Sequence, residues 1–213
     1  MKERTGPIAR PGYRFIFTGL IIFLLGFWAG RLFSLLGLVL TLFFLYFFRD
    51  PERAVPAAPG QVISPADGRI IVMERVREEN FLKEPAQKLS IFMNVFDVHV
   101  NRAPVAGQIH AMVYQPGRYL AANRPEAPDQ NEQLAMHLRT ADGAGIVMVQ
   151  IAGLLARRII SYVQEGDNLE RGERVGLICF GSRVDLYLPE HCQVQVRIGQ
   201  KVKAGSSILG RWS

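Results

Sequence analysis

Three residues that could cooperate in covalent catalysis stand far apart in this 213-residue chain: Ser182, His99 and Asp67. Ser182 follows Gly181, and a glycine both leaves its carbonyl carbon unshielded and allows strained backbone geometry. The hydroxyl of the serine could therefore attack the carbonyl of Gly181. Serine is a weak nucleophile that needs a base, and the base needs a carboxylate to orient it. The candidates for those two roles are His99 and Asp67.

Each of these residues also has an ordinary structural explanation. Gly181 and Ser182 lie between two apolar segments, which is typical of a turn between strands. Asp67 precedes a glycine, as in many plain turns, and His99 alone fits a hydrogen-bonded residue of a strand. The spacing alone does not separate a reaction site from a set of turns.

Motifs for metal or nucleotide chemistry are absent from the sequence. It contains no H-E-x-x-H, no G-x-x-x-x-G-K-[ST], and no G-x-G-x-x-G after a predicted strand. Two cysteines, Cys179 and Cys192, are too few for a disulfide scaffold or a four-cysteine zinc site. The four histidines show no metal-ligand spacing: His99, His110, His137 and His191. We therefore predict no metal site.

The basic charge of the chain is concentrated at its N-terminus. The formal net charge is +6, and residues 1–48 hold five basic groups and one acidic group. The remaining 165 residues hold 20 basic and 18 acidic groups. A nearly neutral body argues against nucleic acid as a partner. Because 49% of the residues are hydrophobic and 21% are charged, a disordered chain is also excluded.

Residues 15–48 have the composition of a membrane segment, with Arg31 as their single charge. One helix of this length would extend about 51 Å, well beyond a hydrocarbon core of about 30 Å. An arginine at mid-bilayer costs at least about 2.5 kcal/mol, whereas an arginine in a turn can reach the interface. We therefore predict two apolar helices, residues 15–30 and 32–48, joined at Arg31. A hairpin that spans the bilayer and a shallow hairpin in one leaflet both remain possible.

Basic residues flank both outer ends of this predicted hairpin: Arg4, Arg10 and Arg14 before it, and Arg49 and Arg53 after it. The positive-inside tendency then places both termini in the cytoplasm, and the flanks would attract anionic headgroups. We expect the protein to work at the cytoplasmic face of the cell membrane.

After a Pro-rich linker at residues 51–60, residues 61–213 have the pattern of a mainly β domain. Short β-branched runs separated by glycine predict strands. They occupy residues 68–73, 89–95, 145–151 and 193–198. A polar segment at residues 119–133 predicts a long loop, either a binding lid or a mobile connection.

Two internal repeats indicate a compact β sandwich or barrel. Residues 65–70 echo residues 104–109, and residues 166–172 echo residues 199–205. The second pair follows the pattern G-x-x-Φ-x-x-G, which predicts a short strand between two glycine turns with positive φ. Such turns are typical of lipoyl-like domains.

Four elements in sequence order resemble the short form of the pyruvoyl-dependent phosphatidylserine decarboxylases. They are the hairpin ending in Phe-Phe-Arg-Asp-Pro at 47–51, Ser-Pro-Ala-Asp-Gly at 64–68, Val-His-Val-Asn-Arg-Ala-Pro at 98–104 and Phe-Gly-Ser-Arg-Val-Asp at 180–185. The resemblance extends from about residue 12 to the end of the chain. The Gly-Ser and Ala-Asp-Gly elements are specific only in combination.

The resemblance implies a proenzyme that makes its own cofactor. The serine attacks the preceding glycine carbonyl, the resulting ester undergoes β-elimination, and the dehydroalanine hydrolyses to ammonia and an N-terminal pyruvoyl group. Here the cut would fall between Gly181 and Ser182, giving a β chain of residues 1–181 and an α chain of residues 182–213. His99 would be the base and Asp67 its partner. The pyruvoyl group from Ser182 would form a Schiff base with the amine of phosphatidylserine and accept electrons as CO2 leaves.

The sequence departs from the long family forms at two positions. Those forms carry D-x-H-x-x-H-x-P, and here Arg102 stands at the second histidine. They also carry threonine after the Gly-Ser element, where this chain has Arg183, as short members commonly do. Arg102, Arg118, Arg124 and Arg183 are the candidates for binding the lipid phosphate.

Two rival interpretations remain open from the sequence. The same chemistry could act on another serine phospholipid, such as archaetidylserine. Alternatively, the chain could be a non-enzymatic, membrane-tethered lipoyl-like adaptor, in which Lys203 is the candidate for a modified lysine. The adaptor hypothesis leaves Asp67, His99 and Ser182 without a joint role.

Overall fold

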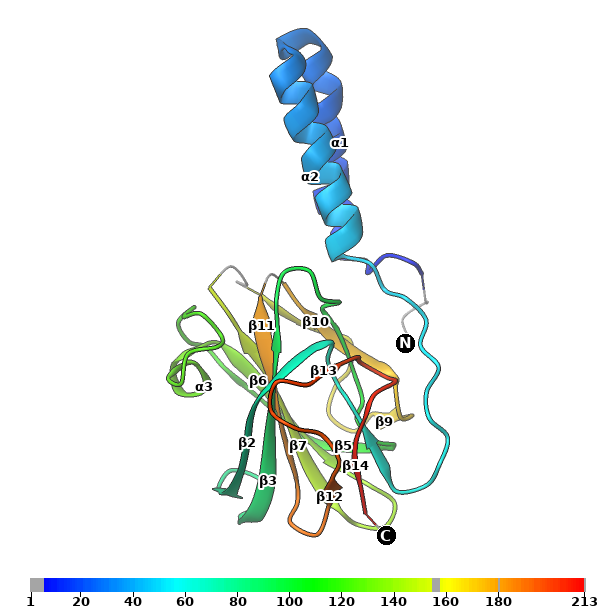
Figure 1. Ribbon diagram of the computed structural model, residues 1–213, viewed down its shortest axis with the longest axis vertical. Helices are drawn as coiled ribbons and strands as arrows, with labels where there is room; N and C mark the ends of the chain where they lie inside the picture. The colour runs from blue at the N-terminus through cyan, green and yellow to red at the C-terminus, as the bar shows by residue number, and fades with distance from the viewer. Residues whose placement is uncertain (1–5, 155–157, 180, 213) are drawn as a thin grey trace. The chain divides into compact units, whose positions relative to one another are not determined.

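The computed structural model describes residues 6–154, 158–179 and 181–212. The chain divides into two compact units, Met1–Glu52 and Arg53–Ser213. The first unit is a pair of helices, α1 (Gly12–Ala29) and α2 (Arg31–Phe47), as Figure 1 shows. The predicted hairpin is therefore confirmed.

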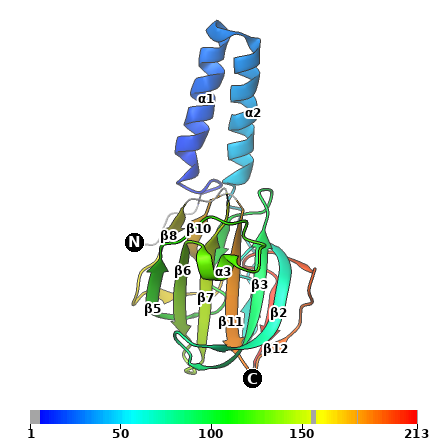
Figure 2. The same cartoon turned by 90° about the vertical axis from the view of Figure 1, so that its left-hand side faces the viewer.

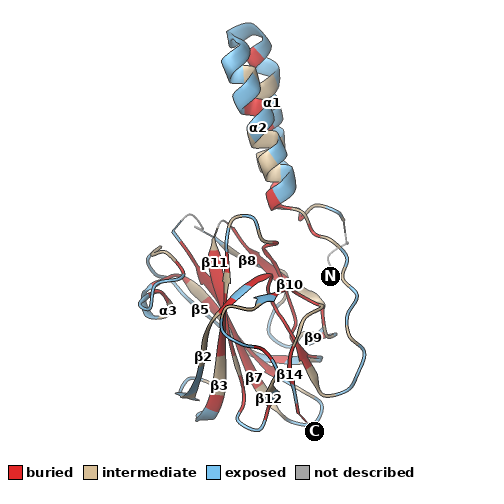
Figure 3. Ribbon diagram, viewed as in Figure 1, coloured by how far each residue is buried: buried red, intermediate tan, exposed pale blue. Residues whose placement is uncertain are grey.

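Small residues allow the two helices to approach closely. Gly12, Gly19 and Gly26 recur at every seventh position of α1, on one face of the helix. A Cβ atom at Gly26 would overlap the backbone of Ser34 in α2. Most other residues of the helices are exposed (Figure 3). Helix α1 is long and apolar enough to cross a membrane, and α2 is a slightly shorter apolar helix.

The second unit is mainly β, as predicted. The bounds of its described elements are β1 Gln61–Ile63, β2 Gly68–Glu78, β3 Glu84–Met93, β4 Val100–Arg102, β5 Gly107–Gln115, α3 Ala127–Gln130, β6 Gln133–Arg139, β7 Gly145–Ala152, β8 Ile159–Ser161, β9 Asn168–Leu169, β10 Arg174–Ile178, β11 Ser182–Pro189, β12 Gln193–Val194, β13 Lys201–Val202 and β14 Ile208–Arg211.

These strands form one large and two small antiparallel sheets. The large sheet has the order β13-β2-β3-β11-β7-β6-β5-β9. Figure 2 shows β5, β6, β7, β11, β3 and β2 of this sheet side by side. The small sheets have the orders β1-β14-β12 and β4-β10-β8. A curled, barrel-like sheet with smaller sheets beside it confirms the predicted fold class.

Strand β7 explains why its sequence is a continuous apolar run. Ile146 and Met148 belong to the main core, whereas Val147 and Val149 belong to a second buried cluster. Since successive side chains point to opposite faces, the strand is buried on both faces. Figure 3 shows this burial along the inner strands.

The β unit contains a pseudo-two-fold relation between its two halves. The large sheet has four strands in each half. Counted inward from the two edges, β13, β2, β3 and β11 match β9, β5, β6 and β7. In the same way, β1-β14-β12 matches β4-β10-β8. We call two residues counterparts when this relation exchanges them.

The strand registers support the relation residue by residue. Asn101 lies opposite Gly176 as Val62 lies opposite Gly210. A register shift interrupts β2 and β3 between Ile70 and Val72, and an equivalent shift interrupts β5 and β6 between Ile109 and Ala111. The first sequence repeat therefore marks the starts of β2 and β5.

The second sequence repeat marks β9 and β13. Its four glycines, Gly166, Gly172, Gly199 and Gly205, all have positive φ, between 78° and 90°. Each pair encloses a two-residue strand, as predicted.

Three predicted strands are confirmed in β2, β3 and β7, but the prediction for residues 193–198 is too long. Strand β12 contains only Gln193 and Val194. Gln195 still donates to the carbonyl of Leu209, but Ile198 is 61% exposed. The alternation of apolar and polar residues predicted a buried side chain at Ile198, whereas the chain turns away from the core before Gly199.

Candidate active site

Ser182 begins the central strand β11 and is fully buried. It lies opposite Met93 of β3 and Ala152 of β7. Because Val184 is in the main core and side chains alternate, the side chain of Ser182 faces the core. Gly181, with φ of 68°, forms the turn into the strand.

His99 lies directly before β4, is fully buried, and contacts the Gly181–Ser182 segment. The backbone N–H of Gly181 donates to its Nε2 atom at 3.2 Å. Its Nδ1 atom lies 3.0 Å from the carbonyl oxygen of Asp97. Because an N–H only donates and a carbonyl only accepts, both contacts require the neutral tautomer with a proton on Nδ1. The lone pair of Nε2 therefore faces the Gly-Ser segment.

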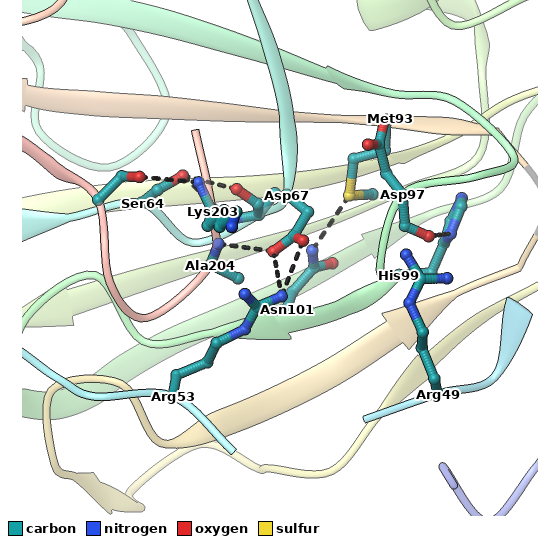
Figure 4. A network of polar contacts seen from close by, with 12 residues as sticks. Arg49, Arg53, Ser64, Asp67, Met93, Asp97, His99, Asn101, Lys203 and Ala204 are labelled. Atoms are coloured by element: carbon teal, nitrogen blue, oxygen red, sulfur yellow. Dashed lines mark hydrogen bonds and ion pairs between the residues drawn. The ribbon is translucent and has the colours of Figure 1, made fainter. Parts of the chain in front are cut away.

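Asp67 lies in the turn before β2, and its carboxylate binds Arg53 and Ala204 (Figure 4). Its carboxylate accepts a hydrogen bond from Arg53 at 2.8 Å and one from the backbone of Ala204 at 2.8 Å. Burial raises the pKa of Asp67, while Arg53 and the Ala204 bond act in the opposite direction. The contacts described for His99 lead instead to Asp97 and Gly181.

Two buried amides near Ser182 were missed by sequence reasoning. Gln150 of β7 donates from Nε2 to Oδ1 of Asn101 at 2.8 Å, and both residues are fully buried. The Nδ2 atom of Asn101 lies 3.5 Å from the sulfur of Met93 (Figure 4). A glutamine inside the apolar run 145–151 was the available signal.

The polar loop is held against the strand next to Ser182. Asn131 is fully buried and donates to the carbonyl oxygens of Leu120 and Ala152, each at 2.8 Å. Gly153, also missed, comes so close to Gly181 that a Cβ there would overlap the carbonyl oxygen of Gly181. The segment predicted as one long loop therefore contains the short helix α3 and is hydrogen-bonded to the end of β7.

Similarity to known proteins identifies the family. The family model described as phosphatidylserine decarboxylase matches residues 40–210. Relatives named phosphatidylserine decarboxylase proenzyme include those of Desulfotalea psychrophila, with 47% identity over 96% of each chain, and Geotalea uraniireducens, with 45% identity over 99% of each. The relative from Oleidesulfovibrio alaskensis is 52% identical over 81% of this chain and 78% of its own. The chain belongs to the phosphatidylserine decarboxylase family.

Within a phosphatidylserine decarboxylase fold, the four candidate arginines differ in environment. Arg183 is buried and binds Asp185 and Ser90, and Arg102 is buried and donates to the carbonyl of Gly172. Arg118 and Arg124 are exposed on the polar loop. Membership of this family does not favour the adaptor or archaetidylserine interpretations.

Proposed function

We propose that the chain is a proenzyme that cleaves itself between Gly181 and Ser182 and then acts as a pyruvoyl-dependent enzyme. As a phosphatidylserine decarboxylase it is a carboxy-lyase, which releases CO2 from phosphatidylserine and leaves phosphatidylethanolamine. The observation that carries the proposal is the contact between His99 and Gly181 beside the buried hydroxyl of Ser182.

The cleavage step follows from the groups present. Oγ of Ser182 bonds the carbonyl carbon of Gly181, and its proton passes to Nε2 of His99. The peptide C–N bond then breaks as His99 returns the proton to the nitrogen of residue 182, which leaves an ester and a free amine. Loss of the α-proton of residue 182 then expels the Gly181 carboxylate. Hydrolysis of the remaining dehydroalanine releases ammonia. Every atom comes from the chain or from water.

The residues present fit a pyruvoyl group at position 182. Within the described part of the chain, Oγ of Ser182 is buried without a hydrogen-bond partner. Cleavage removes this oxygen from residue 182, because Oγ leaves as part of the Gly181 carboxylate. Once formed, the group would supply an electron sink for the electron pair left on the substrate's α-carbon as CO2 departs. The fully buried position of residue 182 would exclude water from the decarboxylation.

The fold provides for two chains that stay together after the cut. The α chain of residues 182–213 supplies β11, which pairs with β3 on one side and β7 on the other. It also supplies β13, paired with β2, and β14, paired with β1. A central strand is not released by one cut at its end, so the β chain 1–181 and the α chain form a heterodimer.

Asp67 joins these two chains directly. It lies in the β chain, and its carboxylate accepts the N–H of Ala204 in the α chain. The ion pair with Arg53 fixes the carboxylate from the other side. We propose that Asp67 belongs to the maturation machinery together with His99.

The apolar hairpin suits a substrate that stays in the bilayer. A diacyl phospholipid presents its headgroup at the interface, so a membrane-held enzyme meets it at high effective concentration. Helix α1 suggests membrane association, and the basic flanks favour the cytoplasmic face. Arg118 and Arg124 are the exposed candidates for the lipid phosphate.

Intact-mass analysis of the purified protein tests the proposal. The active preparation should contain chains of 181 and 32 residues, the smaller one blocked to Edman degradation. Ser182→Ala should remain full length and release no CO2 from phosphatidylserine vesicles. A fully active preparation that is entirely full length would refute self-cleavage. Activity on archaetidylserine vesicles but not on phosphatidylserine vesicles would refute phosphatidylserine as the substrate.

A further inference from the structure

The two buried amides, Asn101 and Gln150, connect two sheets of the β unit beside Ser182. Asn101 belongs to a small sheet and Gln150 to the large one, and their hydrogen bond crosses the space between them. Both side chains are fully buried. Burying amide groups in an apolar interior costs free energy unless every group is bonded. A buried pair of amides at this position therefore suggests a functional role.

The counterparts of this pair are apolar, so the fold itself does not need amides. Asn101 matches Val62 through the paired glycines Gly176 and Gly210. Tyr114 and Arg75 lie equally far beyond the register shifts in β5 and β2, so they are counterparts, as are their partners Leu134 and Gln87. On the next strand, Gln150 of β7 pairs with Leu134, and Leu188 of β11 pairs with Gln87. Gln150 therefore matches Leu188. Val62 and Leu188 are both fully buried core residues.

Two unpaired polar atoms belong to neighbouring residues at this end of the core. Among the described residues, Oε1 of Gln150 and Oγ of Ser182 are both buried without a partner. Gln150 lies opposite Val184, so it is the diagonal neighbour of Ser182 on the adjacent strand and the same face. Diagonal neighbours are within reach of long side chains. One atom can only accept a hydrogen bond, and the other can donate one.

We propose that Gln150 accepts the hydrogen bond of the Ser182 hydroxyl in the proenzyme, and that Asn101 is a positioning residue which fixes Gln150 for this contact. A serine side chain has three staggered rotamers, and a hydrogen bond from Oγ selects among them. The Oγ lone pair then attacks Gly181, and the proton goes to His99. Gln150 neither gains nor loses a proton. This inference rests on the proposed self-cleavage.

The surrounding contacts support these separate roles. Nε2 of His99 already accepts the N–H of Gly181, so before attack the hydroxyl needs another acceptor. Oδ1 of Asn101 accepts from Nε2 of Gln150, which directs the other amide atom, Oε1, away from that bond. Asn101 is itself fixed against the sulfur of Met93, the residue paired with Ser182.

The decisive variant places the counterpart residues at positions 101 and 150. Asn101→Val combined with Gln150→Leu removes the acceptor and leaves no half of the pair behind, which is nearly neutral for stability when the shapes match. We expect its thermal midpoint to stay close to that of Ser182→Ala, an uncleaved reference. Its first-order cleavage rate should fall about 10- to 100-fold, the usual cost of a misplaced reactive group. Cleavage at the wild-type rate would refute the proposal.

Hydroxylamine identifies the step that is affected, because it splits an accumulated ester but not a peptide bond. If positioning fails, the uncleaved double variant contains no ester, and hydroxylamine releases no α chain. Release of the α chain would show that attack proceeds normally, and would overturn the proposal.

A single variant decides the matter if the double variant does not fold. Gln150→Glu keeps a carboxyl oxygen at the acceptor position, so it should mature faster than Gln150→Leu. Equal rates in these two variants would contradict the proposal. Wild-type protein is the control: if it too remains uncleaved, the proposed function fails rather than this inference.

Discussion

His99 and Gly60 occupy equivalent places at opposite ends of the β unit. The carbonyl of His99 accepts the N–H of Ile178, and the carbonyl of Gly60 accepts the N–H of Trp212. We call the first the catalytic end, marked by His99, Asn101, Gln150 and Gly181–Ser182. The second is the counterpart end, marked by Gly60, Val62, Leu188 and Gly143–Ala144. The backbones correspond, whereas the side chains do not.

The comparison separates what the fold requires from what the reaction requires. Gly143 and Gly181 both have positive φ, 87° and 68°, so the turn before each central strand needs a glycine in either half. Only the catalytic end follows that turn with a serine and places a histidine against it. The fold therefore requires the glycine in each turn, whereas the proposed reaction depends on the side chains next to it.

The largest expected effect is at His99. His99→Ala removes the proposed base, and the loss of a general base typically slows a reaction about 10²- to 10⁴-fold. Intact-mass analysis during cell-free synthesis should show the variant remaining at 213 residues. Ala144→Ser is the matched control, because it creates Gly-Ser at the counterpart turn without a histidine. Cleavage after Gly143 in that control would contradict the comparison.

A smaller effect is expected at Gly153, which lies against the scissile carbonyl. Gly153→Ala places a Cβ into the oxygen of Gly181 and must displace that carbonyl, so maturation should slow about tenfold or more. The counterpart position, three residues after Leu188, carries the exposed side chain of His191. His191→Ala should therefore mature normally. Equal rates for Gly153→Ala and wild type would remove the carbonyl contact from the mechanism.

Asp67 offers a test of the bond between the two chains. Asp67→Asn removes the ion pair with Arg53 and weakens the bond from Ala204, at a cost of about 2 kcal/mol for partners left buried. Thermal unfolding of Ser182→Ala with and without Asp67→Asn should show this loss, because both proteins remain uncleaved. Its counterpart in the first repeat is Ala106, so Ala106→Ser, which changes no ion pair, is the control. Normal maturation of both Asp67→Asn and Asp67→Ala would remove Asp67 from the maturation machinery.

The smallest expected effect is a pH dependence at His137, the counterpart of Ser90. Burial, followed by the charges of His110 and Arg139, lowers the pKa of His137 below its ordinary 6.5. The unfolded chain therefore binds the proton more tightly, and stability falls as the pH drops through 6.5 toward the folded pKa. The thermal midpoint should decline between pH 7.5 and 5.5, and less so in His137→Leu. An identical decline in both proteins would contradict this assignment.

Sequence patterns predicted the elements well wherever local physics controls them. The one charge in residues 15–48 marked the helix boundary at Gly30, and β-branched runs marked β2, β3 and β7. The strand at residues 193–198 was predicted too long, since alternation does not reveal where a partner strand ends. The loop containing Asn131 was found, but the bonds that hold it in place depend on distant residues.

By itself, the sequence determined the apolar hairpin, the glycine turns and the Gly-Ser, His and Asp elements. Those features depend on residue type, local periodicity and short motifs. Only the tertiary structure decided that Gly181 contacts His99, that Asp67 binds Arg53 and Ala204, and that Asn101 and Gln150 meet beside Ser182. These contacts join residues far apart in the chain, and strand pairing and register bring them together.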